Sequence, residues 1–172
     1  MSDQNSVDNF GKAFWYIAWI LALLFLTLLF QSILDSKANP NTNPESSENA
    51  SFSEVILKRN DYNAYLSSGR VNGEPAIFIV DTGATQVAVP EHLAKQYGMK
   101  KGRSITVSTA NGLAQAFTSE IAELSIGKIT LYNVRANISP GFKEDGILLG
   151  MSALKQLEFT QRGDTLTLRK YH

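Results

Sequence analysis

The sequence predicts an all-β domain with one or two short helices, preceded by a single transmembrane helix. Three observations support this architecture: an almost uninterrupted apolar run near the start, a polar segment after it, and then short apolar or alternating stretches separated by turn residues. The chain has 172 residues, of which 44% are hydrophobic, so it can bury the core of one compact domain but not comfortably of two.

The composition excludes several classes of function. The formal net charge is zero, so no basic surface is available for nucleic acid. The absence of cysteine excludes a disulfide framework, thiolate catalysis and zinc-ribbon ligands. The chain has only two histidines, His92 and His172, which argues against a histidine-rich metal site. We therefore expect no cofactor, no metal ion and no nucleic-acid partner.

Residues 1–12 are expected to form an N-terminal tail, and residues 13–34 a transmembrane helix. Within this span the stretch AFWYIAWILALLFLTLLF contains one polar residue, Thr27. At about 1.5 Å per residue, its length comes close to the roughly 30 Å hydrocarbon core of a bilayer. Aromatic residues cluster at one end, as they do at a membrane interface, namely Trp15, Tyr16 and Trp19.

A cleaved signal peptide is the alternative interpretation of this segment. The tripeptide at 36–38, Ser-Lys-Ala, loosely resembles a small-x-small cleavage site. However, the apolar run exceeds the usual core of a signal peptide, and Lys12 is the only positive side chain before it. Since Lys12 and Lys37 flank the run on opposite sides, charge alone does not decide which end faces the cytoplasm.

Residues 35–52 are expected to form a disordered linker. Their sequence, DSKANPNTNPESSENASF, is rich in asparagine, serine and proline and has almost no apolar content. Such a linker would allow the domain at 53–172 to stand clear of the bilayer.

The pattern from residue 53 onward predicts a β-sandwich or barrel, because strands and turns follow one another at close intervals. Two short helices are expected, at Pro90–Tyr97 and Ser152–Gln156. The candidate strands are Glu54–Arg59, Ala64–Val71, Pro75–Val80, Gln86–Val89, Ser104–Ser108, Ala114–Ile126, Ile129–Ile138, Gly146–Leu149, Leu157–Thr160 and Thr165–Arg169.

The stretch IFIVDTGATQVAVP at 77–90 is the strongest candidate for a functional site. Its apolar residues predict a strand buried on both faces that ends at Asp81, where an unpaired carboxylate would be costly unless it is compensated or used. Gly83 permits a tight turn, while Thr82 and Thr85 supply hydroxyls. The alternative is an ordinary strand-ending turn with a solvated carboxylate.

Three motifs together resemble a known family. The stretch FIVDTGAT resembles the active-site signature of aspartic proteases, and GILLGMSALKQLEF at 146–159 resembles the second hallmark of that fold. Between them, TANG at 109–112 joins two candidate strands where these proteases carry a flap. The sequence is most similar to the bacterial membrane-anchored retropepsin-like aspartic proteases, over residues 55–169. This resemblance implies a retropepsin-like acid protease barrel and an aspartic endopeptidase domain at 53–172.

The resemblance also implies roles for individual residues. Asp81 would be the catalytic acid and base, and the rest of its loop would support it, with Thr82 bonding across a dimer and Gly83 shaping the turn. The complete set is Asp81 with Thr82, Gly83, Ala84 and Thr85 in the loop, Asn111 and Gly112 in the flap, and Leu148, Leu149 and Gly150 beneath the site. An ordinary hairpin turn is the alternative for the flap residues, and core packing is the alternative for those beneath the site.

A single Asp-Thr-Gly has a consequence for assembly. Aspartic proteolysis needs two carboxylates that share a proton, one acting as base and the other as acid. The other aspartates after the expected linker occur outside any second Asp-Thr-Gly, at Asp61, Asp145 and Asp164. If the chain is an enzyme, the second carboxylate must be Asp81 of another copy, which predicts a two-fold homodimer acting on a peptide or protein substrate.

The family resemblance places the chain in a bacterial inner membrane as a single-pass protein with a periplasmic domain. Two other functions stay open: a catalytically inactive peptide-binding or dimerisation module, and a β-rich structural domain tethered to the membrane. Met151 departs from the retroviral pattern, in which a polar Arg or Asn follows the second glycine. That part of the retroviral dimer network is therefore not carried over.

Overall fold

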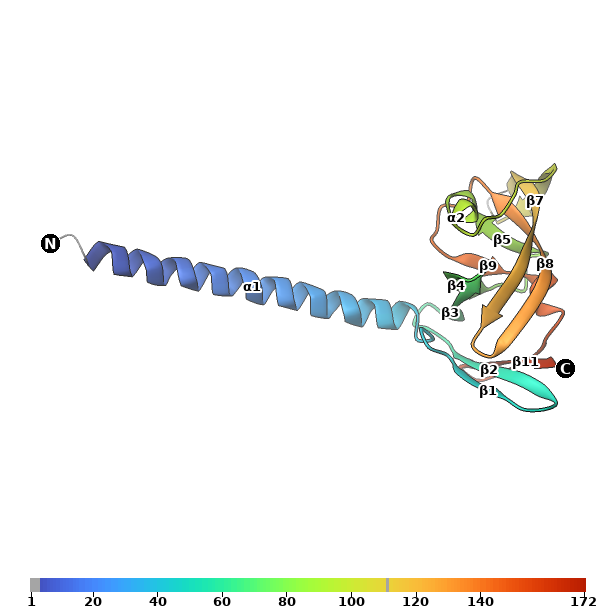
Figure 1. Ribbon diagram of the computed structural model, residues 1–172, viewed down its shortest axis with the longest axis horizontal. Coiled ribbons are helices and arrows are strands. Elements are labelled where there is room, and N and C mark those ends of the chain that lie inside the picture. Colours follow the sequence, from blue (N-terminus) through green and yellow to red (C-terminus); the bar gives the residue numbers. More distant parts are fainter. Residues whose placement is uncertain (1–3, 111) are drawn as a thin grey trace. The chain divides into compact units, whose positions relative to one another are not determined.

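The computed structural model describes residues 4–110 and 112–172 (Figure 1). The chain divides into two compact units, Met1–Lys37 and Ala38–His172. The second unit contains every strand, so the predicted all-β domain is confirmed. Its boundary differs from the expected start at residue 53.

The first unit is dominated by one long helix, α1 (Gln4–Ala38). Its segment Phe14–Gln31 has a mean hydropathy of 2.0 and is entirely unburied, and it is long and apolar enough to cross a membrane. A signal sequence meets the same criteria of length and composition. The helix ends at Ala38 because Pro40 disfavours helical backbone at the residue before it.

The second unit contains two sheets. The smaller sheet is antiparallel throughout, and its strands lie in the order β1 (Glu45–Glu48), β2 (Phe52–Lys58), β11 (Thr165–Tyr171) and β10 (Glu158–Arg162). The larger sheet has the order β3 (Leu66–Val71), β4 (Glu74–Val80), β9 (Ile147–Leu149), β5 (Val87–Pro90), β8 (Ile129–Ser139), β7 (Gly112–Ile126) and β6 (Ser104–Thr109). An additional pairing of β3 with β7 closes much of this sheet into a barrel.

The core lies inside this unit, where alternate residues of each strand point inward. In β2 and β11, the inward apolar side chains are buried while their neighbours are partly exposed. Each fully buried Leu or Ile contributes about 1.5–3 kcal/mol through removal of apolar surface from water. The largest such side chains are Phe78, Leu57, Ile121, Leu124, Ile126, Ile129, Leu131, Ile138, Ile147, Leu149, Leu154 and Leu168. Two short helices, α2 (Glu91–Gln96) and α3 (Met151–Leu154), occur where the sequence predicts them.

The expectation of a disordered linker over residues 35–52 is wrong. Residues 35–38 continue α1, and β1 pairs with β2 along its whole length. Between them, Asn41 is only 2% exposed. Its amide nitrogen donates to the carbonyls of Lys58 (2.8 Å) and Leu66 (2.6 Å), and its Oδ1 accepts the N–H of Lys58 (2.7 Å). Asparagine carries the same donor and acceptor as a peptide group, so this polar segment folds through hydrogen bonds rather than apolar burial.

Asn41→Ala is expected to lower the free energy of unfolding by about 2–3 kcal/mol, because it leaves partly buried backbone groups of Lys58 and Leu66 unsatisfied. Asn43→Ala is the matched control, since Asn43 is exposed and belongs to the same segment. Chemical denaturation of the two variants, followed by near-ultraviolet circular dichroism, makes the comparison. Equal stabilities would show that Asn41 does not hold this segment to the domain.

Candidate active site

Strand β4 delivers Asp81 to the end of the larger sheet. The sequence predicts a strand buried on both faces, and this is wrong for the outer face. Phe78 is fully buried, whereas Ile77 is 39% exposed. Alternate side chains of a strand point to opposite faces, so Ile77 lies on the outer face together with Ile79, which is half-buried. The apolar run therefore contributes side chains to the core on one face and to a partly exposed surface on the other.

The loop after β4 is held by strand β9. The N–H of Asp81 donates to the carbonyl of Leu149 (3.2 Å), which continues the parallel pairing of β4 with β9. On its other side β9 contacts β5, with Ala88 opposite Leu148. The strands before and after the loop are thus separated by β9, so the loop must cross over the end of that strand. This crossover places the loop at the end of the sheet where β4 and β9 terminate.

Within the loop, hydrogen bonds orient the carboxylate of Asp81. Its Oδ1 accepts the N–H of Gly83 at 2.8 Å, and its backbone carbonyl accepts the N–H of Ala84 at 3.3 Å. Asp81 and Ala84 are half-buried, while Thr82, Gly83 and Thr85 are exposed. Neither the hydroxyl of Thr82 nor that of Thr85 forms a hydrogen bond with another residue in the described ranges. The loop therefore presents an oriented carboxylate and two available hydroxyls to solvent.

Gly150 provides the close packing beneath this loop. A Cβ atom at this position would lie 2.3 Å from the carbonyl oxygen of Gln86 and 2.7 Å from that of Ala84, far inside normal contact distances. The next residue, Met151, donates its N–H to the same Ala84 carbonyl at 2.8 Å. The requirement for glycine here is one of space, since its φ of −86° is accessible to any residue.

Ser152 is a supporting residue that sequence reasoning missed. It is buried, and its hydroxyl accepts the N–H of Val87 (2.9 Å) while donating to the carbonyl of Arg135 (2.6 Å). It therefore ties the start of α3 to both β5 and β8. The one available signal was a small polar residue at the start of a predicted helix, which does not distinguish this role from a solvent-facing serine.

The other residues expected at the site divide between two places. Leu149 is buried and Leu148 half-buried beside the Asp81 loop. Gly112 lies in a separate hairpin formed by β6 and β7, where its φ of 104° suits glycine and its carbonyl accepts the hydroxyl of Thr109 at 2.8 Å. Asn111, also expected in this turn, lies outside the described residues.

The remaining aspartates of the domain lie in three other segments. Asp164 forms an ion pair with Arg59 in the turn between β10 and β11. Asp145 contacts His92 at 3.1 Å and precedes β9, so it lies at the opposite end of that strand from Leu149. Asp61 is exposed in the turn before β3. Within the described ranges, no group of three His, Asp or Glu side chains could hold a metal ion.

Comparisons with known proteins give a consistent result. The gag-polyprotein putative aspartyl protease family matches residues 67–156, which include both the Asp81 loop and Gly150. A curated Sinorhizobium protein, described as an uncharacterized protein in the cobV 5' region, is 38% identical over 120 residues. That match covers 67% of this chain and 52% of the relative, so the chain spans about half the length of the curated relative.

Two solved structures are also similar. The crystal structure of a retropepsin-like aspartic protease from Rickettsia conorii matches with a TM-score of 0.58 and 26% identity, over 74% of this chain and 95% of that protein. The EIAV protease in complex with an inhibitor matches with a TM-score of 0.43 and 15% identity, over 52% of this chain and 84% of that one.

Proposed function

The chain belongs to the gag-polyprotein putative aspartyl protease family and has a retropepsin-like fold, and from this premise we propose that it is a membrane-anchored aspartic endopeptidase. The observation that carries the proposal is the Asp81 loop. It offers an oriented carboxylate and two exposed hydroxyls on a segment that the family match includes.

The proposed catalytic unit is a homodimer in which two Asp81 carboxylates share one proton. The ionised carboxylate takes a proton from a water molecule, whose oxygen then attacks the carbonyl carbon of the peptide bond. The protonated carboxylate gives its proton to the carbonyl oxygen, which forms a tetrahedral diol. Collapse of the diol transfers a proton to the amide nitrogen and breaks the C–N bond. No other aspartate of the domain occurs in an Asp-Thr-Gly triplet, so the second carboxylate of the proposed pair is Asp81 of the other copy.

In this dimer, the exposed Thr82 would donate to the loop of the second copy, and Gly83 would bring its backbone close to the substrate. The β6–β7 hairpin, which contains Gly112 and is where the sequence predicts Asn111, would close over a peptide bound in extended form through backbone hydrogen bonds. Ala84, Thr85, Leu148, Leu149 and Gly150 would hold the two loops at a fixed separation.

The membrane anchor is the second part of the proposal. The segment Phe14–Gln31 would hold the chain in a bacterial inner membrane by a single pass, with the domain in the periplasm. Bacterial relatives in Sinorhizobium and Rickettsia support the cellular setting. Confinement to a membrane raises the effective concentration of a second copy and so favours the dimer.

The full chain is expected to remain in the membrane fraction after alkaline carbonate washing and to be released by detergent. A chain lacking residues 1–34 should appear in the soluble fraction. Alkaline phosphatase fused after residue 172 should be active, because it folds only in the periplasm. A shortened wild-type chain in the soluble fraction would instead identify a cleaved leader, and an inactive fusion would reverse the orientation.

Cleavage of an unstructured peptide library by the detergent-solubilised full chain tests the enzymatic function. Wild-type protein and Asp145→Asn are expected to cut the same bonds, whereas Asp81→Asn should leave the library intact. Products are identified by mass spectrometry from acidic to neutral pH. Identical cleavage by wild-type and Asp81→Asn protein, or none by a wild-type preparation shown to be dimeric, would reject the proposal.

A further inference from the structure

The second compact unit starts at Ala38, which is also the last residue of α1. The carbonyl of Ala38 accepts a hydrogen bond from the side-chain amide of Asn60 (2.8 Å), and the N–H of Asn60 donates to the carbonyl of Ala64 (2.9 Å). Asn60 is only 7% exposed and lies in the turn before β3. The chain therefore passes from α1 into folded structure, whereas the composition of residues 35–52 predicts a disordered tether.

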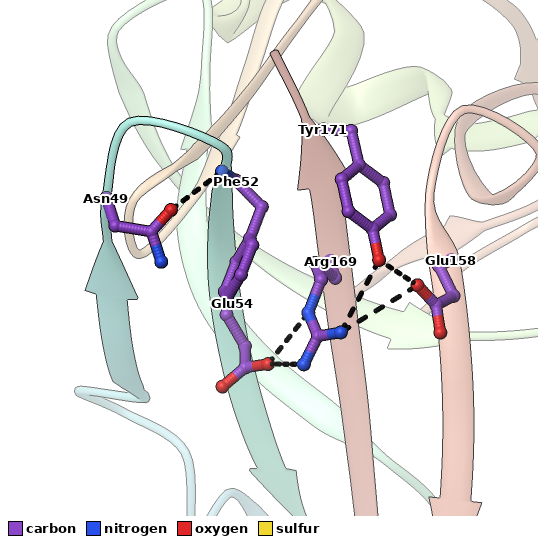
Figure 2. Close-up of polar contacts among 6 residues, drawn as sticks. All are labelled: Asn49, Phe52, Glu54, Glu158, Arg169 and Tyr171. Carbon is purple, nitrogen blue, oxygen red and sulfur yellow. Dashed lines mark hydrogen bonds and ion pairs between the residues drawn. The ribbon is translucent and has the colours of Figure 1, made fainter.

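The segment that follows Ala38 is bonded to distant parts of the domain. Asn49 accepts the N–H of Phe52 (3.0 Å) in the turn between β1 and β2, and β2 then pairs with β11 along its whole length (Figure 2). Across this pairing, Glu54 accepts two hydrogen bonds from Arg169, at 3.0 and 2.5 Å. The Arg169 guanidinium also lies 4.4 Å from the centre of the Phe52 ring. Lengthening the tether would break such contacts, so this segment does not supply the roughly 60 Å of reach that 18 disordered residues would.

The Asp81 loop lies at the end of the larger sheet where the chain enters the domain. Strands β3 and β4 are antiparallel, with Leu66 opposite Ile79, so the start of β3 lies beside the end of β4. There the N–H of Val80 donates to the carbonyl of Tyr65 (2.9 Å). The turn before β3, which bonds to the last residue of α1, thus leads directly to the neighbour of Asp81.

The distance between the anchor and Asp81 is limited by this path. Three hydrogen bonds and two peptide links connect Ala38 to Asp81, each step covering about 4–9 Å between Cα atoms, so the two residues lie within about 30 Å of each other. The helix from Gln31, where the apolar segment ends, to Ala38 spans about 10 Å. In an anchored chain, Asp81 therefore stays within about 40 Å of the hydrocarbon core, whatever the orientation of the domain.

We propose that the substrates are proteins anchored in the same membrane, cut in an extended segment within about 40 Å of the bilayer. The inference rests on the proposed membrane-anchored protease and names its substrate class. The limit holds for one chain or for a dimer, because each copy carries its own anchor. An extended chain covers about 3.3 Å per residue, so a bond about 15 residues beyond a membrane span can reach the whole of this layer.

Confinement to one membrane distinguishes this class from freely diffusing proteins. A flexible tether of about 30 residues has a root-mean-square length of about 30 Å, so a bond at its end stays in the layer to which Asp81 is limited. A freely diffusing protein fills the whole compartment instead. For the same amount of substrate, its concentration at the site is therefore much lower.

Co-reconstitution in vesicles of phosphatidylethanolamine and phosphatidylglycerol tests this substrate class. The full chain is inserted together with single-span reporters that carry one peptide identified from the library, placed about 15, 30 or 240 residues beyond the span on a glycine-serine tether. A soluble reporter without the span carries the same peptide at the same total concentration. We expect the reporters with 15 and 30 residues to be cut at least about tenfold faster than the soluble one. The longest tether spreads its bond over a layer about threefold thicker than 30 residues do, so its cleavage should be about threefold slower.

Raising the domain above the membrane tests the distance itself. A helical spacer of twelve EAAAK repeats, inserted after Leu34, lifts the attachment point by about 90 Å, so Asp81 stays at least about 70 Å from the hydrocarbon core. The tether of 15 residues spans only about 50 Å, so its cleavage should fall at least about tenfold. A glycine-serine insert of the same length is the matched control, because it bends back and leaves this reporter within reach. Equal cleavage of the soluble reporter by all three chains shows that both inserted chains are folded.

Either of two results would overturn this substrate class. One is cleavage of the soluble reporter as fast as the anchored ones, and the other is equal cleavage of the shortest reporter by the chain with the helical spacer and by its flexible control. Cleavage of no reporter by any chain would reject the protease itself, and this substrate class with it. The two failures are distinct, because the soluble reporter measures catalysis without any dependence on distance from the membrane.

Discussion

Adding Asp81→Asn chains to wild-type chains is expected to suppress peptide cleavage, although the amount of wild-type protein stays constant. If each active site takes one Asp81 from each copy, mixed dimers are inactive. A ninefold excess of the variant then converts most wild-type chains into mixed dimers and lowers the rate about tenfold by mass action. The variant alone should cleave at least about 10³-fold more slowly, since it loses both the general acid and the general base.

The measurement is an initial rate on one peptide identified from the library, after the chains have exchanged in detergent. Asp145→Asn is the control, because it makes the same change of charge at an exposed position at the far end of β9. It should neither slow cleavage nor suppress the wild-type rate. A rate that does not change with excess Asp81→Asn would mean that each chain is active alone, and the shared site would be wrong.

Gly150→Ala is expected to lower the free energy of unfolding by about 3 kcal/mol and to abolish cleavage. The added methyl group would overlap the backbone oxygens of Gln86 and Ala84, which both belong to the loop between β4 and β5. Backbone cannot rotate away as a side chain can, so the loop or β9 must shift. Because catalysis requires groups held within about 0.5 Å, activity should fall even at temperatures where the variant is still folded.

Gly141→Ala is the matched control for this substitution. A Cβ at Gly141 would meet nothing within 4 Å, and this residue is not among those with positive φ. Its melting temperature should equal that of the wild type, while Gly150→Ala melts well below both. If the two variants melt together, the close approach of β9 to the Asp81 loop is not a tight constraint on this fold.

Local sequence patterns were sufficient to predict most of the strands and both short helices of the domain. Alternation and turn residues located β2, β4, β7, β8 and β11 to within a few residues, because each of these strands carries its own signal of which face is buried. The two short helices were located for the same reason. The Asp-Thr-Gly triplet and the later Leu-Leu-Gly identified the two segments that meet at the site, since only certain residues allow a tight turn and a close backbone contact.

Other features depend on partners far along the chain. Asn41 becomes a buried residue only because Lys58 and Leu66 present unsatisfied backbone groups to it. Ile77 is 39% exposed because the rest of the domain covers the outer face of β4 only in part. Neither fact follows from local composition, in which a polar segment indicates disorder and an apolar strand indicates burial. The flap residue Asn111 and the catalytic roles stay predictions.

The sequence by itself determined the chemistry that this protein can offer: one Asp-Thr-Gly loop, no cysteine, few histidines and a single long apolar helix. Only the tertiary structure decided how that chemistry is presented. It inserted β9 between β4 and β5, placed Gly150 against the Asp81 loop, and bonded the segment after α1 to the domain. Residue types fix which bonds are possible, but strand order and register fix which groups meet, and these arise from contacts between distant segments.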